Sequence, residues 1–260
     1  MLNLRRFGGS FSHAHSSTLW KKSDKIQYSV DCPESISIDH FEPADYAWLH
    51  ESRSIIPDQY KIASTNFDEL KKEYKLVFTH DQELIAKDPE FFKFVPACGY
   101  WIEEPKIHDK SKMLSFITSN KTMCPGHKYR LEWKNRLDGK CDLYGRGFNE
   151  VEKKEEALND YYFSIVIENG KYDTYFTEKI LDCFAVGTIP VYYGTDNIVN
   201  YFNKDGILLL DDSFDPHSLT PELYHSMSTA IYDNFERVKS YNTVEDWMYT
   251  TYFKSGDSSE

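Results

Sequence analysis

The sequence is poor in cysteine, in basic residues and in long apolar segments. Its 260 residues include five cysteines, an odd number without a Cys-x-x-Cys spacing, which argues against a disulfide framework or a zinc site. No run approaches the roughly 18 apolar residues of a membrane span, and the N-terminus has no apolar core of a signal peptide. We therefore expect no membrane anchor and no secretion signal.

Basic side chains are outnumbered by acidic ones. Lysine and arginine total 30 against 42 aspartates and glutamates, which gives a net charge of −12. An acidic surface repels nucleic acid and anionic membranes, so neither is expected as a partner. A phosphorylated substrate would need a local basic cluster against this background.

One such cluster surrounds Arg130, with Lys121, His127, Lys128 and Lys134 close to it in the sequence. A guanidinium can bind a phosphate through two parallel hydrogen bonds, which makes Arg130 a candidate phosphate ligand. A solvated helix that carries ordinary surface charges is the alternative interpretation.

Strand and helix patterns alternate along the chain. Apolar or β-rich segments predict strands at 26–30, 45–49, 75–79, 113–118, 161–167, 188–193 and 207–210. The segment 94–101, which contains Pro96 and Gly99, fits a strand followed by a turn. Helical patterns occur at 67–74, 126–137 and 177–187, and a final helix is predicted to open at Thr220. This alternation predicts an α/β fold with parallel sheets. The polar segment 103–112 is a candidate linker, so we expect two domains, 1–105 and 106–260.

The most informative segment is 162–194, which reads as a strand, a loop, a helix and a second strand. Thr177 can cap the helix, Glu178 and Lys179 occupy its first turn, and Gly187 can end it. Ligands bind at the carboxyl ends of parallel strands, and a helix N-terminus attracts phosphate. Lys179 would add a full charge, and Glu178 could accept hydrogen bonds from ribose hydroxyls. The alternative is a simple helix cap with Lys179 as a solvated charge.

This segment resembles the signature of glycosyltransferase family 10, the α1,3/α1,4-fucosyltransferases. In that family an apolar strand runs through F-E-N and a variable loop into Y-V/I-T-E-K, a helix and a strand with I/V-P-V/I. Here the corresponding runs are Ile167-Glu168-Asn169, Tyr175-Phe176-Thr177-Glu178-Lys179 and Ile189-Pro190-Val191. Ile replaces the first Phe, and Phe replaces the Val.

Weaker similarity extends to both sides, over roughly residues 45–215. Ser119-Asn120 followed by Arg130 resembles a serine–asparagine pair and a later arginine near the donor phosphates. A strand that ends at Glu51-Ser52 resembles the family's E-S-P element, with Arg53 where many members have proline.

The resemblance implies a GT-B fold, with two facing Rossmann-like domains: an acceptor-side domain at 1–105 and a donor-binding domain at 106–260. It implies an inverting enzyme that moves L-fucose from GDP-fucose to a glycan hydroxyl, with Glu51 as the catalytic base. The implied donor-binding residues are Arg130, Asn169, Tyr175, Thr177, Glu178 and Lys179. No metal or other cofactor is expected, because no D-x-D motif is present and cations can stabilise the leaving GDP.

Two alternatives remain open. The donor could be another nucleotide sugar, since phosphate and ribose contacts do not read the sugar, or the chain could be a non-catalytic nucleotide-sugar-binding relative. The expected location is the cytosol of a bacterium or of a virus-infected host. Three further patterns receive structural interpretations: an irregular N-terminus around His13 and His15, a turn near the donor pocket at 145–147, and a solvated helix start at 150–156.

Overall fold

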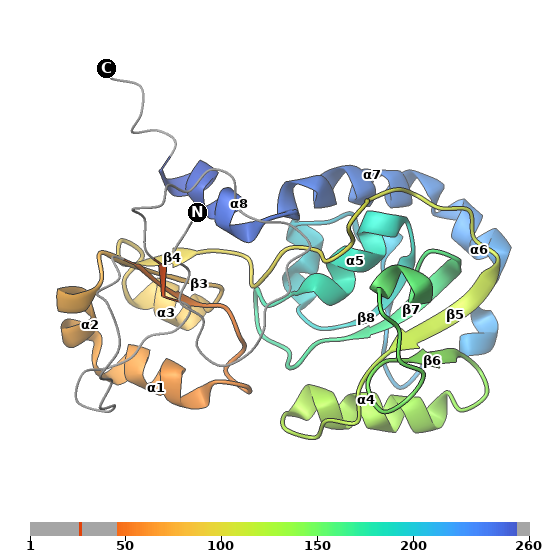
Figure 1. Cartoon of the computed structure of the whole chain (residues 1–260), viewed down its shortest axis with the longest axis horizontal. Helices are drawn as coiled ribbons and strands as arrows, with labels where there is room; N and C mark the ends of the chain where they lie inside the picture. Colours follow the sequence, from red (N-terminus) through yellow and green to blue (C-terminus); the bar gives the residue numbers. More distant parts are fainter. Residues whose placement is uncertain (1–25, 28–45, 254–260) are drawn as a thin grey trace, which may run out of the picture.

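The computed structural model describes residues 26–27 and 46–253. Two parallel β-sheets occupy opposite ends of this part of the molecule, and helices cover both (Figure 1). His13, His15 and most of the strand predicted at 26–30 lie outside the described residues. The predicted α/β class with two parallel-sheet domains, the GT-B architecture, is confirmed.

The first sheet has the order β1-β2-β3-β4, with every described pairing parallel. Its strands are β1 (Ile26–Gln27), β2 (Tyr46–Leu49), β3 (Leu76–Thr79) and β4 (Phe92–Phe94). The helices that accompany it are α1 (Pro57–Thr65), α2 (Phe67–Glu73) and α3 (Gln82–Lys87). The strands predicted at 45–49 and 75–79 and the helix at 67–74 are confirmed, whereas α1 and α3 were not predicted.

The strand followed by a turn that was predicted within 94–101 begins and ends earlier in the chain than expected. The strand ends at Phe94, and an irregular connection follows it. Pro96 has no N–H to donate to a sheet, which disfavours a strand interior. Gly99 packs so tightly that an added Cβ would lie 2.5 Å from the carbonyl oxygen of Tyr241. This segment therefore serves as a connection packed against the second domain.

The second sheet has the order β6-β5-β7-β8-β9 and is also parallel. Its strands are β5 (Lys112–Ile117), β6 (Asp142–Tyr144), β7 (Tyr161–Ile167), β8 (Ile189–Tyr193) and β9 (Leu208–Leu209). The helices are α4 (Pro125–Arg136), α5 (Glu178–Val186), α6 (Pro221–Ser226) and α7 (Ser228–Val238). Single turns of 3₁₀ helix occur at Lys154–Ala157, Asp196–Asn200, Lys204–Gly206, Pro216–Ser218 and Lys239–Tyr241. The predicted strands and helices of this half match these elements within a few residues.

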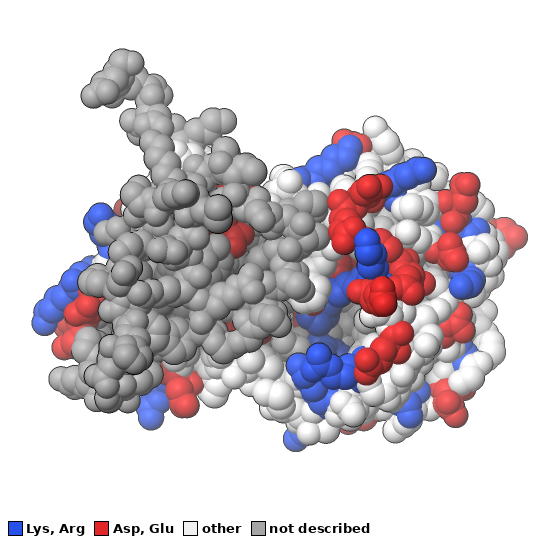
Figure 2. Space-filling view, viewed as in Figure 1, with Lys and Arg blue, Asp and Glu red and all other residues white. Residues whose placement is uncertain are grey.

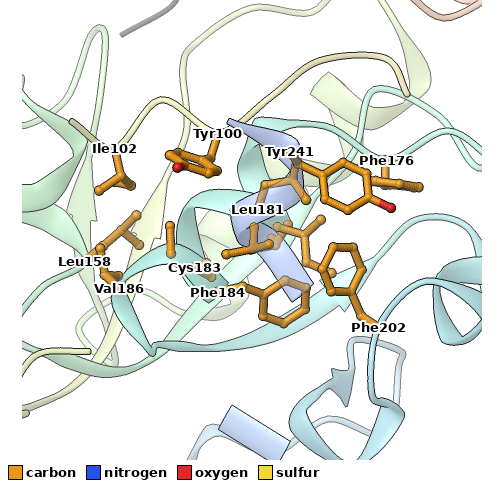
Figure 3. Close-up of a cluster of buried hydrophobic side chains, with 14 of the residues drawn as sticks. Tyr100, Ile102, Leu158, Phe176, Leu181, Cys183, Phe184, Val186, Phe202 and Tyr241 are labelled. Atoms are coloured by element: carbon orange, nitrogen blue, oxygen red, sulfur yellow. The ribbon is translucent and has the colours of Figure 1, made fainter. Parts of the chain in front are cut away.

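The core of the second domain lies on both faces of β7, as its continuous apolar run predicts. One face packs against α5, and the aromatic part of that cluster includes Phe176, Phe184, Phe202 and Tyr241 (Figure 3). Gly187 ends α5 in the left-handed conformation, with φ of +73°, where a residue without Cβ is favoured. The strand–helix–strand unit predicted at 162–194 therefore forms the centre of this domain.

Within residues 46–253 the chain crosses between the sheets twice. Residues 95–111 make the first crossing, and the second leads into α8 (Val244–Tyr252), which packs on the first sheet. Val244 and Met248 of α8 lie in one cluster with Trp48 and Phe78. The predicted boundary between residues 105 and 106 falls in the first crossing, although α8 returns to the other side.

The helix predicted to open at Thr220 is α6, and Thr220 Oγ1 accepts a hydrogen bond from the Leu223 N–H at 3.1 Å. It is not the last helix, because α7 and α8 follow. None of the helices formed by residues 46–253 is both long and apolar enough to span a bilayer.

Candidate active site

A pocket of about 660 Å³ lies between the two domains. Residues from the first domain and the connection, among them Glu51 and Cys98, line one side. The carboxyl ends of β5 and β7 and the first turns of α4 and α5 line the other. The structure brings all the predicted site residues into this pocket: Glu51, Arg130, Asn169, Tyr175, Thr177, Glu178 and Lys179. Their individual roles stay predictions.

The start of α4 approaches the end of β7 closely because residue 126 is glycine. An added Cβ there would lie 2.0 Å from the carbonyl oxygen of Glu168. The Gly126 N–H donates to the carbonyl oxygen of Asn169 at 3.0 Å. This contact places the helix that carries Arg130 directly beside the loop between β7 and α5, residues 168–177.

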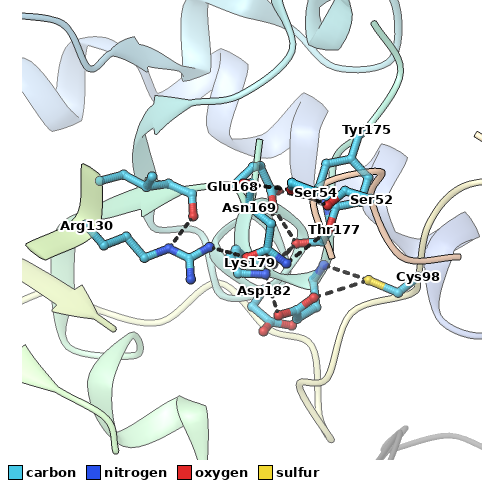
Figure 4. A network of polar contacts seen from close by, with 12 residues as sticks. Ser52, Ser54, Cys98, Arg130, Glu168, Asn169, Tyr175, Thr177, Lys179 and Asp182 are labelled. Carbon is cyan, nitrogen blue, oxygen red and sulfur yellow. Dashed lines mark hydrogen bonds and ion pairs between the residues drawn. The ribbon is translucent and has the colours of Figure 1, made fainter. Parts of the chain in front are cut away.

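The first turn of α5 is oriented by a buried carboxylate that the sequence analysis did not single out. Glu168 accepts hydrogen bonds from the Thr177 N–H at 2.9 Å and the Thr177 hydroxyl at 2.8 Å (Figure 4). Burial raises the pKa of Glu168. The sequence signal that could have identified Glu168 was its position within the family motif, between Ile167 and Asn169. Glu168 and Thr177 together fix where the N-terminus of α5 points.

Lys179 lies among carboxylates at the start of α5. Its Nζ is 3.0 Å from Glu178 Oε1 and 3.7 Å from Glu168 Oε2. Burial alone would lower the pKa of Lys179, but these two carboxylates raise it overall. Burial would likewise raise the pKa of Glu178, yet the ammonium groups of Lys179 and Lys154 lower it. Lys179 is therefore a cation, and Glu178 an ionised hydrogen-bond acceptor, at neutral pH.

Arg130 is buried at the pocket wall and held in one orientation. Its Nε donates to the Ile167 carbonyl oxygen at 2.8 Å, and its Nη2 donates to Asn169 Oδ1 at 2.8 Å (Figure 4). The amide of Asn169 in turn lies 3.4 Å from the Tyr175 hydroxyl. Nη1 makes no hydrogen bond within the described part of the chain, so it is available to a ligand. Asn169 and Tyr175 thus hold Arg130 in addition to lining the pocket.

Glu51 follows β2 and reaches the pocket from the opposite domain. Its main-chain carbonyl oxygen accepts a hydrogen bond from the Tyr60 hydroxyl at 2.8 Å and lies 3.2 Å from His80 Nε2. The nearby Ser54 hydroxyl donates to the Asn169 carbonyl oxygen at 3.2 Å, which connects this loop to the loop between β7 and α5. Burial raises the pKa of Glu51, and Lys179 offsets part of that rise. The carboxyl group is thus shifted in the direction that suits a general base.

The pocket is basic within an acidic protein. Lys121, Arg130, Arg146, Lys154 and Lys179 line it, against Glu51, Glu178 and Asp182. Figure 2 shows basic side chains, with acidic ones beside them, at a hollow in the second domain. Among residues 46–253, no carboxylate lies within ion-pair distance of Lys121, Arg130 or Arg146. The local cluster that a phosphorylated ligand requires is therefore present.

His127 belongs to the same wall. It is almost fully buried, and its Nδ1 has no hydrogen-bond partner among the described residues. Burial lowers its pKa to about 4, and the positive charges of Arg130, Lys121 and Lys179 act in the same direction. His127 is therefore neutral at pH 7.

The turn at 145–147 lies at the pocket, as the sequence analysis predicted. Gly145 and Gly147 have positive φ angles of 110° and 85°, and Arg146 lines the pocket. The interpretation of 150–156 as a solvated helix start is wrong for Lys154. Its Nζ lies 2.6 Å from Asp182 and 4.2 Å from the ring centroid of Trp101. Both partners lie far away in sequence, so no local pattern could have indicated the contact.

Among residues 46–253 there is no group of three or more His, Cys, Asp or Glu side chains that could hold a metal ion. The predicted independence from a metal remains a prediction.

Comparisons with known proteins identify a family that this chain matches. The protein-family sequence model for the C-terminal region of glycosyltransferase family 10 (fucosyltransferase) matches residues 107–254 of this chain. The human 4-galactosyl-N-acetylglucosaminide 3-alpha-L-fucosyltransferase 9 is 26% identical over 157 residues, 58% of this chain and 42% of the relative. The alpha-(1,3)-fucosyltransferase FucT of Helicobacter pylori is 36% identical over 66 residues, 25% of this chain and 14% of the relative.

Among solved structures, an alpha1,3-fucosyltransferase with GDP-fucose is similar over 83% of this chain and 65% of that chain, with 19% identity and a TM-score of 0.35. The chain spans less than half the length of these curated relatives.

Proposed function

The chain belongs to glycosyltransferase family 10, and we propose that it transfers L-fucose from GDP-fucose to a hydroxyl group of a glycan acceptor. The observation that carries the proposal is the pocket, which places Glu51 of one domain opposite Arg130 and Lys179 of the other. A carboxylate that accepts a proton and cations that receive a leaving diphosphate are the two requirements of such a transfer.

In this proposal the diphosphate of the donor lies between Arg130 Nη1, Lys179 and the N-terminus of α5. The helix N-terminus contributes free N–H groups and a partial positive charge. Glu178, ionised beside Lys179, accepts hydrogen bonds from the ribose hydroxyls. Asn169, Tyr175 and Thr177 act mainly by holding these groups in place.

The transfer is a single displacement with inversion. Glu51 takes the proton of the acceptor hydroxyl while that oxygen forms a bond to the anomeric carbon of fucose. The bond between this carbon and the diphosphate breaks, and GDP leaves with the electron pair. Arg130 and Lys179 stabilise the charge that develops on GDP, so the proposal needs no metal.

The elevated pKa of Glu51 suits this role. A stronger base accepts a proton more readily, provided that it is ionised at the working pH. Asp81 and Glu83, the other carboxylates close by in sequence, are paired with Arg53 at 2.5 Å and 2.8 Å. Glu51 is therefore the better candidate base.

A donor panel tests the proposal. Purified protein is incubated with GDP-fucose, GDP-mannose, UDP-galactose or UDP-N-acetylglucosamine, each with terminal β-galactosyl-N-acetylglucosaminide acceptors and excess chelator. We expect GDP release and an acceptor mass gain of one deoxyhexose with GDP-fucose alone. Faster turnover of a UDP-sugar would refute the donor, and loss of turnover in chelator would refute the metal-free mechanism. Binding of GDP-fucose without transfer to any acceptor of a broad glycan panel would indicate a non-catalytic relative.

A further inference from the structure

Beyond Glu178 the pocket continues to a polar cluster that the proposed transfer does not use. Asp182 lies four residues after Glu178, one turn further along the same face of α5, about 6 Å away along the helix axis. Its Oδ2 lies 2.6 Å from Lys154 Nζ, and its Oδ1 accepts a hydrogen bond from the Trp101 main-chain N–H at 2.5 Å. All three residues line the pocket.

This cluster has unused hydrogen-bonding capacity. A carboxylate offers about four acceptor sites, and the contacts to Lys154 and Trp101 occupy only part of them. The Lys154 ammonium makes one contact of hydrogen-bond length and lies 3.6 Å from Glu178, so it can donate to a further group. The indole Nε1 of Trp101 is buried and has no partner in the described part of the chain. Asp182 and Lys154 line the pocket, so their unfilled hydrogen-bonding capacity is open to a ligand there.

The position of the cluster indicates which part of the ligand it would contact. This step rests on the proposed function, in which Arg130 and Lys179 bind the diphosphate and Glu178 binds the ribose. A nucleoside diphosphate continues from ribose to base, and Lys154 bridges the carboxylates of Glu178 and Asp182. Apolar side chains from three different segments also line the pocket, as a flat ring requires: Ile117, Leu158 and Val166.

We propose that Asp182 and Lys154 bind the Watson–Crick edge of guanine and so select GDP. Asp182 accepts hydrogen bonds from N1–H and from the exocyclic amino group, and Lys154 donates to O6. Guanine presents two neighbouring donors and one acceptor, which matches a carboxylate beside an ammonium. Uracil presents carbonyl oxygens on both sides of its single N–H, and one of them would face the carboxylate. Adenine presents an unprotonated N1 where guanine has a donor.

The competing explanation is that the pair only holds the interdomain connection against α5. Both roles predict that Asp182→Asn lowers GDP affinity, so affinity for GDP alone does not separate them. Base selectivity does, because a structural defect weakens every nucleotide alike. Xanthosine diphosphate is the informative ligand: its base carries a carbonyl oxygen where guanine carries the amino group, and an amide can donate to that oxygen.

The experiment measures equilibrium binding of GDP, inosine diphosphate, xanthosine diphosphate and UDP by calorimetry. The parent protein should prefer GDP over inosine diphosphate, which lacks the amino group, and over xanthosine diphosphate. Asp182→Asn should weaken GDP binding by about 5- to 100-fold, as expected for losing one paired base contact, and should bind xanthosine diphosphate more tightly than GDP. Asp212→Asn, at an exposed carboxylate paired with Arg136, is the matched control and should keep the parental order.

Several results would overturn the proposal. Equal loss for all four nucleotides in Asp182→Asn would assign the residue a structural role. Equal affinity of the parent for GDP and inosine diphosphate would do the same, and that comparison needs no variant if Asp182→Asn fails to fold. A parent that prefers UDP would refute the GDP donor itself. If the parent prefers GDP and Asp182→Asn also still prefers GDP over xanthosine diphosphate, only the assignment of Asp182 to the base would be refuted.

Discussion

Replacing Glu51 by glutamine is the most direct test of the mechanism. Glutamine keeps the size of the side chain and some of its hydrogen bonding, but it does not accept a proton at neutral pH. The main-chain contacts to Tyr60 and His80 do not involve the carboxylate, so the loop should keep its position. The change therefore removes the base and leaves its support intact.

The expected loss follows from the role. General-base catalysis contributes typically about 10²- to 10⁴-fold, so transfer from GDP-fucose should fall by that factor. GDP affinity should stay close to that of the parent, because Arg130, Lys179 and Glu178 are untouched. The acid limb of the pH–rate profile should also disappear, and in the parent it should lie above the ordinary range of a glutamate because burial raises the pKa of Glu51.

The stability of this variant has a predictable sign. A carboxyl group with a raised pKa in the folded state binds more protons there than in the unfolded state, so its ionisation costs stability as pH rises. Glutamine removes that cost. The melting temperature of Glu51→Gln at pH 7 should equal or exceed that of the parent, and the difference should vanish below the ordinary glutamate pKa of 4.5.

Initial rates with GDP-fucose, calorimetric GDP binding and thermal melts measure these three effects. Glu90→Gln, at a strongly exposed carboxylate in the same domain, is the control and should behave as the parent. Near-parental transfer by Glu51→Gln would remove Glu51 from the mechanism. Parallel loss of GDP binding would instead make Glu51 a donor contact.

Four further substitutions test the site and the residues that support it. Lys179→Ala should weaken GDP binding by about 1.5–3 kcal/mol through loss of a charged contact. Arg130→Lys should also weaken GDP binding, because an ammonium cannot bridge Ile167, Asn169 and a phosphate as a guanidinium does. Calorimetry checks both, with the exposed Lys128→Ala as control, and unchanged affinity would place the diphosphate elsewhere. Tyr60→Phe removes the hydroxyl that holds the Glu51 carbonyl oxygen, so the turnover number should fall up to about 100-fold while GDP affinity holds; steady-state kinetics would contradict this by showing a change in donor KM alone. Gly126→Ala places a Cβ 2.0 Å from the Glu168 carbonyl oxygen, so overpacking should cost about 1–3 kcal/mol of stability and displace Arg130, visible as a lower melting temperature and weaker GDP binding; a parental melt would show that α4 can shift freely.

Local sequence patterns determined much of the second domain. The apolar run of β7, the cap at Thr177 and the stop at Gly187 are adjacent in sequence, and each acts through bonds to its near neighbours. The same continuity made the donor loop recognisable as that of glycosyltransferase family 10. Arg130 could be named from its basic neighbours in sequence and from the family resemblance, and Glu51 from the resemblance alone.

Only the tertiary structure decided which distant side chains complete the site. In the sequence, Lys154 is one of several charged residues in the segment 150–156. In the structure it lies in the pocket, in contact with Asp182 and Trp101, which are 28 and 53 residues away in sequence. The support of Glu51 by Tyr60 and His80, and the return of α8 to the first sheet, depend equally on contacts between separate segments. Periodicity and capping report the surroundings of a residue within about one helical turn or strand. The packing of the two domains determines which pocket side chains are buried and which charges lie beside them. Burial and neighbouring charges in turn determine the pKa values and the free hydrogen-bonding groups of the pocket.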